Sequence, residues 1–224
     1  MAALSHAATG FGLGIALGVS PGPVQILLLT EAARGGLKRG FRAMAGANGT
    51  FLVLLLLLAA GVTAVTPSGA ALRVLEVAGG ALLLWIAIDA GVDVFRGHDL
   101  EQAEQKARSA AAASTGGRRT ATAVLARPET RGVLAVVLNP GGWLFLATTA
   151  TALVADATEG EGRPAAFVTV VALMVGVSVM DGLTVLLGGG GSLLTGRAGR
   201  WIRLALTLAL AAIGILFVIR GIRG

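Results

Sequence analysis

The stretch GVSPGPVQIL (residues 18–27) interrupts what otherwise reads as one membrane-crossing helix. Apolar sequence precedes it (FGLGIALG) and follows it (ILLLT), but Pro21 and Pro23 stand on either side of a glycine in its middle. Proline has no amide hydrogen and collides with the carbonyl four residues earlier, so it breaks helices. In hydrocarbon, each unsatisfied backbone group costs several kcal/mol. We therefore expect this break to be buried in protein or to line a watery cavity.

The composition places the chain in a membrane. Of its 224 residues, 55% are hydrophobic and 13% are charged, and its mean hydropathy is +0.82; soluble domains carry roughly 25% charged residues. Cysteine is absent, which excludes disulfides and thiolate-bound metals. His6 and His98 both lie outside the apolar runs, so we expect no metal site and no cofactor.

Six apolar segments and the charges between them predict a topology. The loops after the first, third and fifth segments hold fourteen of the eighteen basic residues. The positive-inside rule puts those loops in the cytoplasm and both termini outside, although Arg220 and Arg223 fit this orientation poorly. We read MAALSHAATGF as part of a retained first span, because no basic region precedes it. The six segments are approximately residues 7–30, 43–65, 71–95, 131–155, 164–187 and 201–220.

The two halves of the chain share an order of features. NPGGWLFLAT (139–148) repeats the break of SPGPVQILLL (20–29), and DGLTVLLGG (181–189) repeats the polar-glycine pair of NGTFLVLLL (48–56). Three spans plus three spans cross the membrane in opposite senses, as in inverted-repeat transporters. The predicted fold is thus an all-α polytopic membrane protein with six transmembrane helices, built as two inverted three-helix repeats whose first and fourth helices are broken. Its parts are a first repeat (1–96), a cytoplasmic linker (97–130) that begins with a short polar helix, and a second repeat (131–224).

The breaks expose backbone groups that suit a small zwitterion. Pro21 removes the usual hydrogen-bond donor to the carbonyl of Leu17, and Pro140 does the same for Val136. The helix that follows each break offers free amides at its positive end, which favour a carboxylate, while freed carbonyls favour an ammonium group or a cation. A plain proline kink is the alternative reading, and two breaks in corresponding spans argue against it.

Glycines recur every four residues before the first break. Gly10, Gly14, Gly18 and Gly22 fall on one helical face and form a small-xxx-small ladder. Such a ladder lets another backbone approach closely, either within one chain or between the chains of a homo-oligomer.

Asp181 is the strongest candidate among the polar residues within the spans. Carboxylates inside a membrane are costly and usually face a cavity, where they carry protons or bind cations. We expect Asp181 to bind the ammonium group of a substrate or to carry the coupling ion. Asn48 and Thr50 are its approximate counterparts in the second span, and Gln25 follows the first break.

Other acidic residues have simpler interpretations. Glu31 is predicted near the cytoplasmic mouth, and Glu76 as an interfacial partner of Arg73. Asp89 and Asp93 approach the cytoplasmic end of the third span, where pairing with Arg96 is sufficient to explain them.

These motifs resemble those of the LysE/RhtB family of amino-acid exporters. The resemblance covers nearly the whole chain outside 97–125, and the combination of PGP with a later NP is fairly specific. It implies six spans in a bacterial cytoplasmic membrane and ion-driven export of amino acids or related metabolites. The residues after the second break, Gly141 and Gly142, depart from the family pattern, as does the absence of an acid in the second span. The stretches that carry the resemblance are GVSPGPVQILLL, ARGGLKRGF, EVAGGALLLWIAID, LNPGGWLFLAT and LALAAIGILFVIRG.

The sequence therefore predicts a secondary exporter that works by alternating access. We expect neither an enzyme nor a nucleic-acid-binding protein, since no nucleophile–base pair or metal constellation appears and the basic residues gather in loops. Two alternatives stay open: a small-cation exporter, and a non-transporting membrane factor that assists envelope lipid export. The predicted substrate-binding residues are Pro21, Gly22, Pro23, Gln25, Asn48, Thr50, Asn139, Pro140, Gly141 and Asp181.

Overall fold

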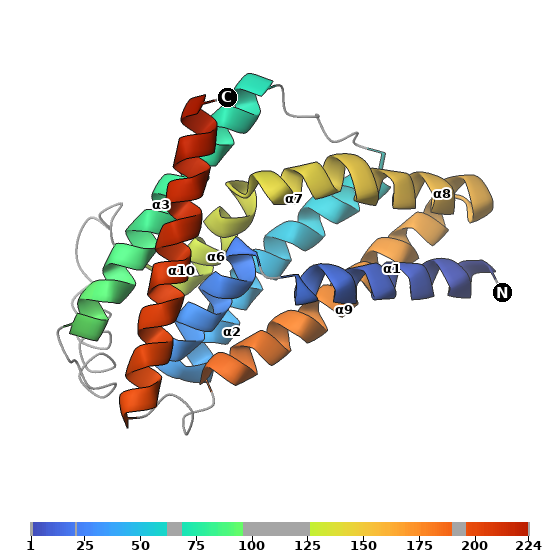
Figure 1. The fold of residues 1–224 in the computed structure, drawn as a ribbon. Helices are drawn as coiled ribbons and strands as arrows, with labels where there is room; N and C mark the ends of the chain where they lie inside the picture. Colours follow the sequence, from blue (N-terminus) through green and yellow to red (C-terminus); the bar gives the residue numbers. More distant parts are fainter. Residues whose placement is uncertain (1, 21, 62–68, 96–125, 190–195, 224) are drawn as a thin grey trace, which may run out of the picture.

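A computed structural model describes the whole chain except residues 1, 21, 62–68, 96–125, 190–195 and 224. Every regular element in the described part is helical. Figure 1 shows α3 and α10 side by side at one edge of the molecule, with α1 and α8 toward the opposite edge. In chain order the elements are α1 (Ala2–Val19), α2 (Pro23–Ala59), α3 (Gly69–Phe95), α6 (Pro128–Val137), α7 (Pro140–Phe145), the π-helical turn η1 (Leu146–Ala150), α8 (Thr151–Glu161), α9 (Arg163–Gly189) and α10 (Gly196–Arg223).

Several of these helices can cross a membrane. Pro23–Ala59, Arg163–Gly189 and Leu204–Arg223 are long and apolar enough. A fourth span results if Pro128–Val137 and Pro140–Glu161 are counted as one, and these two are bent by 53° at the NPG break. Leu4–Val19 is a shorter apolar helix. The protein is therefore an all-helical, multi-pass membrane protein with three or four candidate spans, and one helix pair is bent at Pro140, as that proline predicted.

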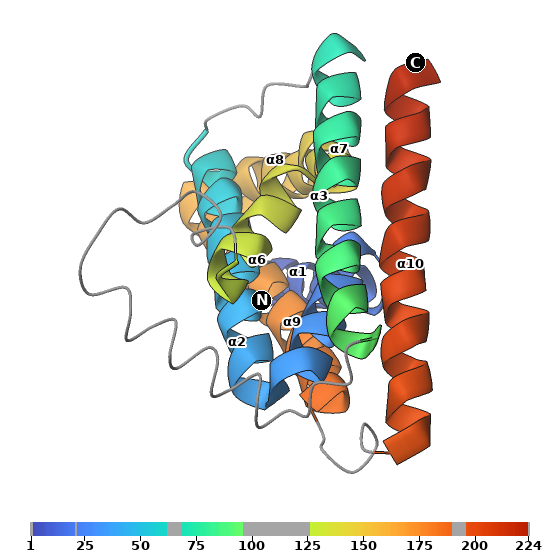
Figure 2. The same cartoon turned by 90° about the vertical axis from the view of Figure 1, so that its left-hand side faces the viewer.

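Helix α2 consists of two helical pieces. Its backbone leaves the helical region at Gly35 and at Gly36, where φ is +71° and ψ is −174°. A residue with a side chain rarely adopts this conformation, so Gly36 is what permits the sharp bend. The bend falls in the basic stretch predicted as the first loop, and Figure 2 shows the two pieces of α2 meeting at one end of the molecule. The first piece thus covers the end of the predicted first span, and the second piece covers the predicted second span.

The start of α2 lies where the apolar clusters of the molecule meet. One cluster joins α2 and α6 to α8 and α9, a second joins α2 and α6 to α3 and α10, and a third lies between α2 and α9. Val24, the second residue of α2, packs against all three. The chain just after the first break is therefore held by protein on several sides.

The glycine ladder of α1 packs against α9 within the same chain. A Cβ atom at Gly10 or Gly14 would lie under 3.0 Å from the backbone carbonyl oxygen of Thr169 or Leu173, and one at Gly18 equally close to Met180. The fourth predicted member, Gly22, lies beyond the end of α1. The part of the ladder on α1 thus serves a contact between helices of one chain.

Gly14→Ala is expected to destabilise the protein by about 1–3 kcal/mol, because its new Cβ atom would strike the carbonyl oxygen of Leu173, which cannot rotate away. The matched control is Gly12→Ala on the same helix, since no atom lies within 4 Å of its added Cβ. Thermal unfolding of the purified proteins in detergent would measure both. Equal melting temperatures for the two variants would contradict the packing.

Candidate functional site

Helices α2 and α9 bring together three of the predicted polar residues. Asn48 on α2 donates a hydrogen bond from Nδ2 to Oγ of Ser178 on α9, at 3.2 Å. Asp181 lies one helical turn after Ser178, and its carboxylate has the side chains of Asn48 and Gln25 close by. One residue from each piece of α2 thus lies near one carboxylate on α9.

Asp181 is buried without a satisfying partner. The residue is 1% exposed, yet neither carboxylate oxygen has a hydrogen-bond partner within the described part of the chain. Most buried polar atoms in proteins are hydrogen-bonded, and an exception calls for an explanation such as an ion or a ligand. The described residues hold no group of three or more His, Cys, Asp or Glu side chains placed to bind a metal ion. Asp181 is therefore a single acidic acceptor among amides and a hydroxyl.

The first break presents an uncapped helix start beside this cluster. Gly22 is the N-cap residue of α2 and offers no side chain to the first-turn amides. The amide oxygen of Gln25 lies near Gly22, at 3.1 Å from where a Cβ atom would stand. Ser20 is exposed, while Gly22 and Pro23 are half-buried, so this backbone is not sealed by protein. Pro21 lies outside the described residues. The uncapped amides give this end of α2 a partial positive charge.

The second break is capped by its own side chain. Asn139 accepts a hydrogen bond from the backbone amide of Gly141 at 3.1 Å, which satisfies one of the free donors at the start of α7. Pro140 is buried as the first residue of that helix. Thr50, the predicted counterpart of Asp181 in the second span, donates to the carbonyl of Gly46 in its own helix at 2.8 Å. The two breaks are therefore unequal, and the first is the one with open donors.

The prediction that the prolines leave backbone carbonyls without a donor was wrong for two of those carbonyls. The carbonyl of Leu17 accepts the amide of Ser20, and that of Val136 accepts the amide of Asn139, both at 3.2 Å. Each is a bond to the third residue along, the tighter pattern with which helix ends satisfy their last carbonyls. The indole nitrogen of Trp143 also donates to the carbonyl of Val137, at 2.7 Å. Backbone oxygens at the breaks are thus less available to a cation than the prolines alone indicated.

A buried network of charges, which the sequence did not predict, lies on α2, α3 and α6. Glu31 is 0% exposed and Arg131 is 2% exposed. The guanidinium of Arg131 bonds Oε1 of Glu31 at 2.7 Å and also bonds the carboxylate of Asp89. Asp89 also contacts Arg34 on α2 at 3.0 Å, while Arg96, its predicted partner, lies outside the described residues. Glu76 contacts Arg220 across α3 and α10, at 3.9 Å, rather than lying only beside Arg73.

The signal for this network was present in the sequence but incomplete. Glu31 and Arg131 are charges at the edges of long apolar runs, which marks each as needing a partner. Nothing in the sequence pairs two residues that stand 100 positions apart.

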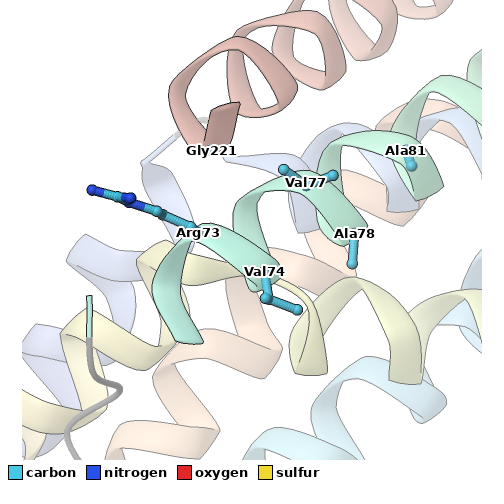
Figure 3. Close-up of a pocket in the computed structure, with 6 residues that line it drawn as sticks. All are labelled: Arg73, Val74, Val77, Ala78, Ala81 and Gly221. Carbon is cyan, nitrogen blue, oxygen red and sulfur yellow. The ribbon is translucent and has the colours of Figure 1, made fainter. Parts of the chain in front are cut away.

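A groove of about 420 Å³ opens between α3 and α10, away from these residues. Figure 3 shows Val74, Val77 and Ala78 along its α3 wall, with Gly221 on the other side. None of its lining residues belongs to the predicted site. The groove therefore marks a contact of the α3–α10 pair and not the cluster at Asp181.

Comparison with known proteins assigns the chain to a family. A family model described as LysE type translocator matches residues 15–221, which includes both breaks and the cluster at Asp181. No curated protein and no solved structure matches. Together with the candidate membrane-spanning helices and the helix pair bent at the NPG break, this match means that the chain belongs to the LysE type translocator family, whose members export amino acids and other small molecules and are not enzymes.

Proposed function

We propose that this protein exports an amino acid, or a closely related small metabolite, from the bacterial cytoplasm by ion-coupled alternating access. The observation that carries the proposal is the buried carboxylate of Asp181, which lies next to Asn48 and Gln25 and has no hydrogen-bond partner among the described residues. A substrate with an ammonium group would supply the missing donors. In the absence of substrate, a proton on the carboxylate would relieve its charge, so one residue serves both binding and coupling.

The carboxylate of the same substrate has a complement at the first break. The start of α2 has no capping side chain, and free amides at a helix start bind anions. Gln25 joins the two features, because its side chain lies near both Gly22 and Asp181. We therefore assign the ammonium group to Asp181 and Asn48, and the carboxylate to the backbone after Gly22 and Pro23.

The second break has a supporting role in this proposal. Asn139 caps its own helix through Gly141, so the backbone around Pro140 keeps its shape without a ligand. We assign Asn139, Pro140 and Gly141 to the wall of the transport path, with Thr50 beside it on α2.

The packing of the helices supports a two-fold relation between the halves. Helix α1, the first piece of the first span, packs on α9, while α6, the first piece of the fourth span, packs on α2. If each half of the chain took the place of the other, the contact of α1 with α9 would become the contact of α6 with α2. Gly80 and Gly214 also meet reciprocally, since a Cβ atom on either would lie under 3.0 Å from the carbonyl oxygen of the other. Reciprocal contacts of this kind are typical of a two-fold axis. Two inverted halves are the usual basis of alternating access.

Counterflow in proteoliposomes would test the function. Vesicles loaded with an unlabelled amino acid should take up the labelled form of their substrate, and a panel of amino acids would identify it. Flux that responds only to cations would replace this proposal by a cation exporter. The absence of flux with any amino acid or cation would favour a non-transporting membrane factor.

A further inference from the structure

The charges on α2, α3 and α6 form one continuous network. Arg39 donates from Nε to Oε2 of Glu31 at 2.6 Å, so both oxygens of that carboxylate are bonded to arginine. Arg34 contacts Oδ2 of Asp89 at 3.0 Å and Oε1 of Glu31 at 3.7 Å. The guanidinium carbon of Arg131 also lies 4.8 Å from the ring centre of Trp85. Two acids are thus shared among three arginines.

Arg131 is the member of this network that comes from the second half of the chain. Glu31, Arg34 and Arg39 lie on α2, Asp89 and Trp85 lie on α3, and Arg131 lies on α6. The α2–α6 contact beside it is close, because a Cβ atom on Gly132 would lie under 3.0 Å from the carbonyl oxygen of Ala43. The network therefore bridges the two proposed repeats through one side chain.

The network lies at a matching distance from both breaks. Glu31 is eight residues after Pro23, and Arg131 is eight residues before Asn139. At 1.5 Å per helical residue, each is about 12 Å from its break. Both lie on the side of the basic loops, which we assign to the cytoplasm. Along both α2 and α6, the network thus lies between the break and the adjoining basic loop.

Stability alone does not account for this arrangement. Replacing a buried ion pair by apolar residues is often neutral or stabilising, because removing charges from water costs about as much as their attraction returns. Separating Arg131 from its acids would leave neither acid alone, since Glu31 keeps Arg39 and Asp89 keeps Arg34. Opening the network would therefore leave each acid with an arginine partner.

We propose that Arg131 is a latch which closes the cytoplasmic path to Asp181 by binding Glu31 and Asp89, and which opens when substrate enters. This inference rests on the proposed function for its direction. It assigns the described structure to a state closed on the cytoplasmic side. Glu31 on α2 and Asp89 on α3 bind the latch when it is closed, and Arg131 on α6 is the residue that moves.

Thiol labelling would test the latch directly, because the chain contains no cysteine. Ser178→Cys places a single thiol beside Asn48, in the cluster around Asp181. A membrane-impermeant maleimide would be added to inside-out vesicles and, separately, to right-side-out vesicles. Adding Arg131→Gln should raise the labelling rate about tenfold or more in inside-out vesicles, which expose the cytoplasmic face, and leave the other face unchanged.

A matched control and a milder variant keep the test decisive. Arg42→Gln breaks an ion pair with Glu129 between the same two helices, but both side chains are substantially exposed, and such pairs contribute little. It should leave labelling unchanged. If Arg131→Gln does not insert into the membrane, Asp89→Asn takes its place, since it removes one acid of the latch and leaves Glu31 intact.

The outcomes separate the latch from the transport function. An unchanged labelling rate in an inserted Arg131 or Asp89 variant would overturn the latch, and so would an equal increase from both faces, which indicates general loosening. Labelling does not depend on substrate. A wild-type protein that moves no amino acid but whose labelling responds to Arg131→Gln would therefore refute the proposed function and leave the latch standing.

Discussion

Asp181→Asn is expected to reduce amino-acid exchange about a hundredfold or more and, at the same time, to raise the thermal stability of the protein. The loss follows because removing one partner of a buried charge contact costs about 2–5 kcal/mol, and Asp181 is the unpartnered carboxylate of the cluster. The gain follows because an unsatisfied buried group costs about 1–3 kcal/mol. Opposite changes in activity and stability are what a functional residue, unlike a structural one, should give.

Counterflow at several pH values and thermal unfolding in detergent would measure the two effects. If Asp181 carries the coupling proton, the wild-type rate should vary with pH and the residual rate of the variant should not. Asp156→Asn is the matched control, because Asp156 is a largely exposed carboxylate on α8 whose partner is His6. Exchange by Asp181→Asn at an unchanged rate and with an unchanged pH dependence would refute the role of Asp181.

Glu31→Met is expected to destabilise the protein by about 3–5 kcal/mol, the largest stability loss that we predict. Glu31 is fully buried and bonds Arg39 and Arg131. Removing Glu31 takes away one of the two carboxylates that bond the buried guanidinium of Arg131. Removing one partner of a buried ion pair costs about 3–5 kcal/mol. The double variant Glu31→Met/Arg131→Met should recover most of the loss, because it removes both buried charges together.

Arg131→Met by itself should cost less than Glu31→Met, since both acids keep an arginine on α2. Unfolding of purified protein in mixed micelles would compare the three variants with the wild type, and Arg42→Met, which breaks an exposed pair, should change stability by no more than about 1 kcal/mol. A double variant that is less stable than either single variant would show that the network is a structural bridge of additive contacts.

The local sequence was sufficient to locate the breaks. Proline acts on its own neighbours through steric exclusion and a missing donor, so the interruptions after Val19 and after Val137 could be read directly. Burial of Asp181 could be predicted for a similar reason, because a carboxylate within a long apolar run has no aqueous surface nearby. The glycine ladder of α1 likewise indicated a close helix contact before its partner was known.

The sequence was a poorer guide to which backbone groups stay free. Proline shows which carbonyl loses its usual donor, but the chain can turn more tightly and supply another, as it does at Leu17 and Val136. It also did not distinguish Asn48, which reaches α9, from Thr50, which bonds its own helix. That choice depends on the rotation of α2 about its axis, and packing against other helices sets this rotation.

What the sequence by itself determined is thus the membrane class, the positions of the broken helices and the isolation of Asp181, because each depends on hydropathy or on bonds within a few residues. Only the tertiary structure decided that Gln25 and Asn48 converge on Asp181, and that Arg131 reaches Glu31 and Asp89. These contacts join side chains far apart in the chain. They depend on which faces of the helices pack together. The free energy of that packing is spread over many apolar contacts, and no short sequence motif specifies them.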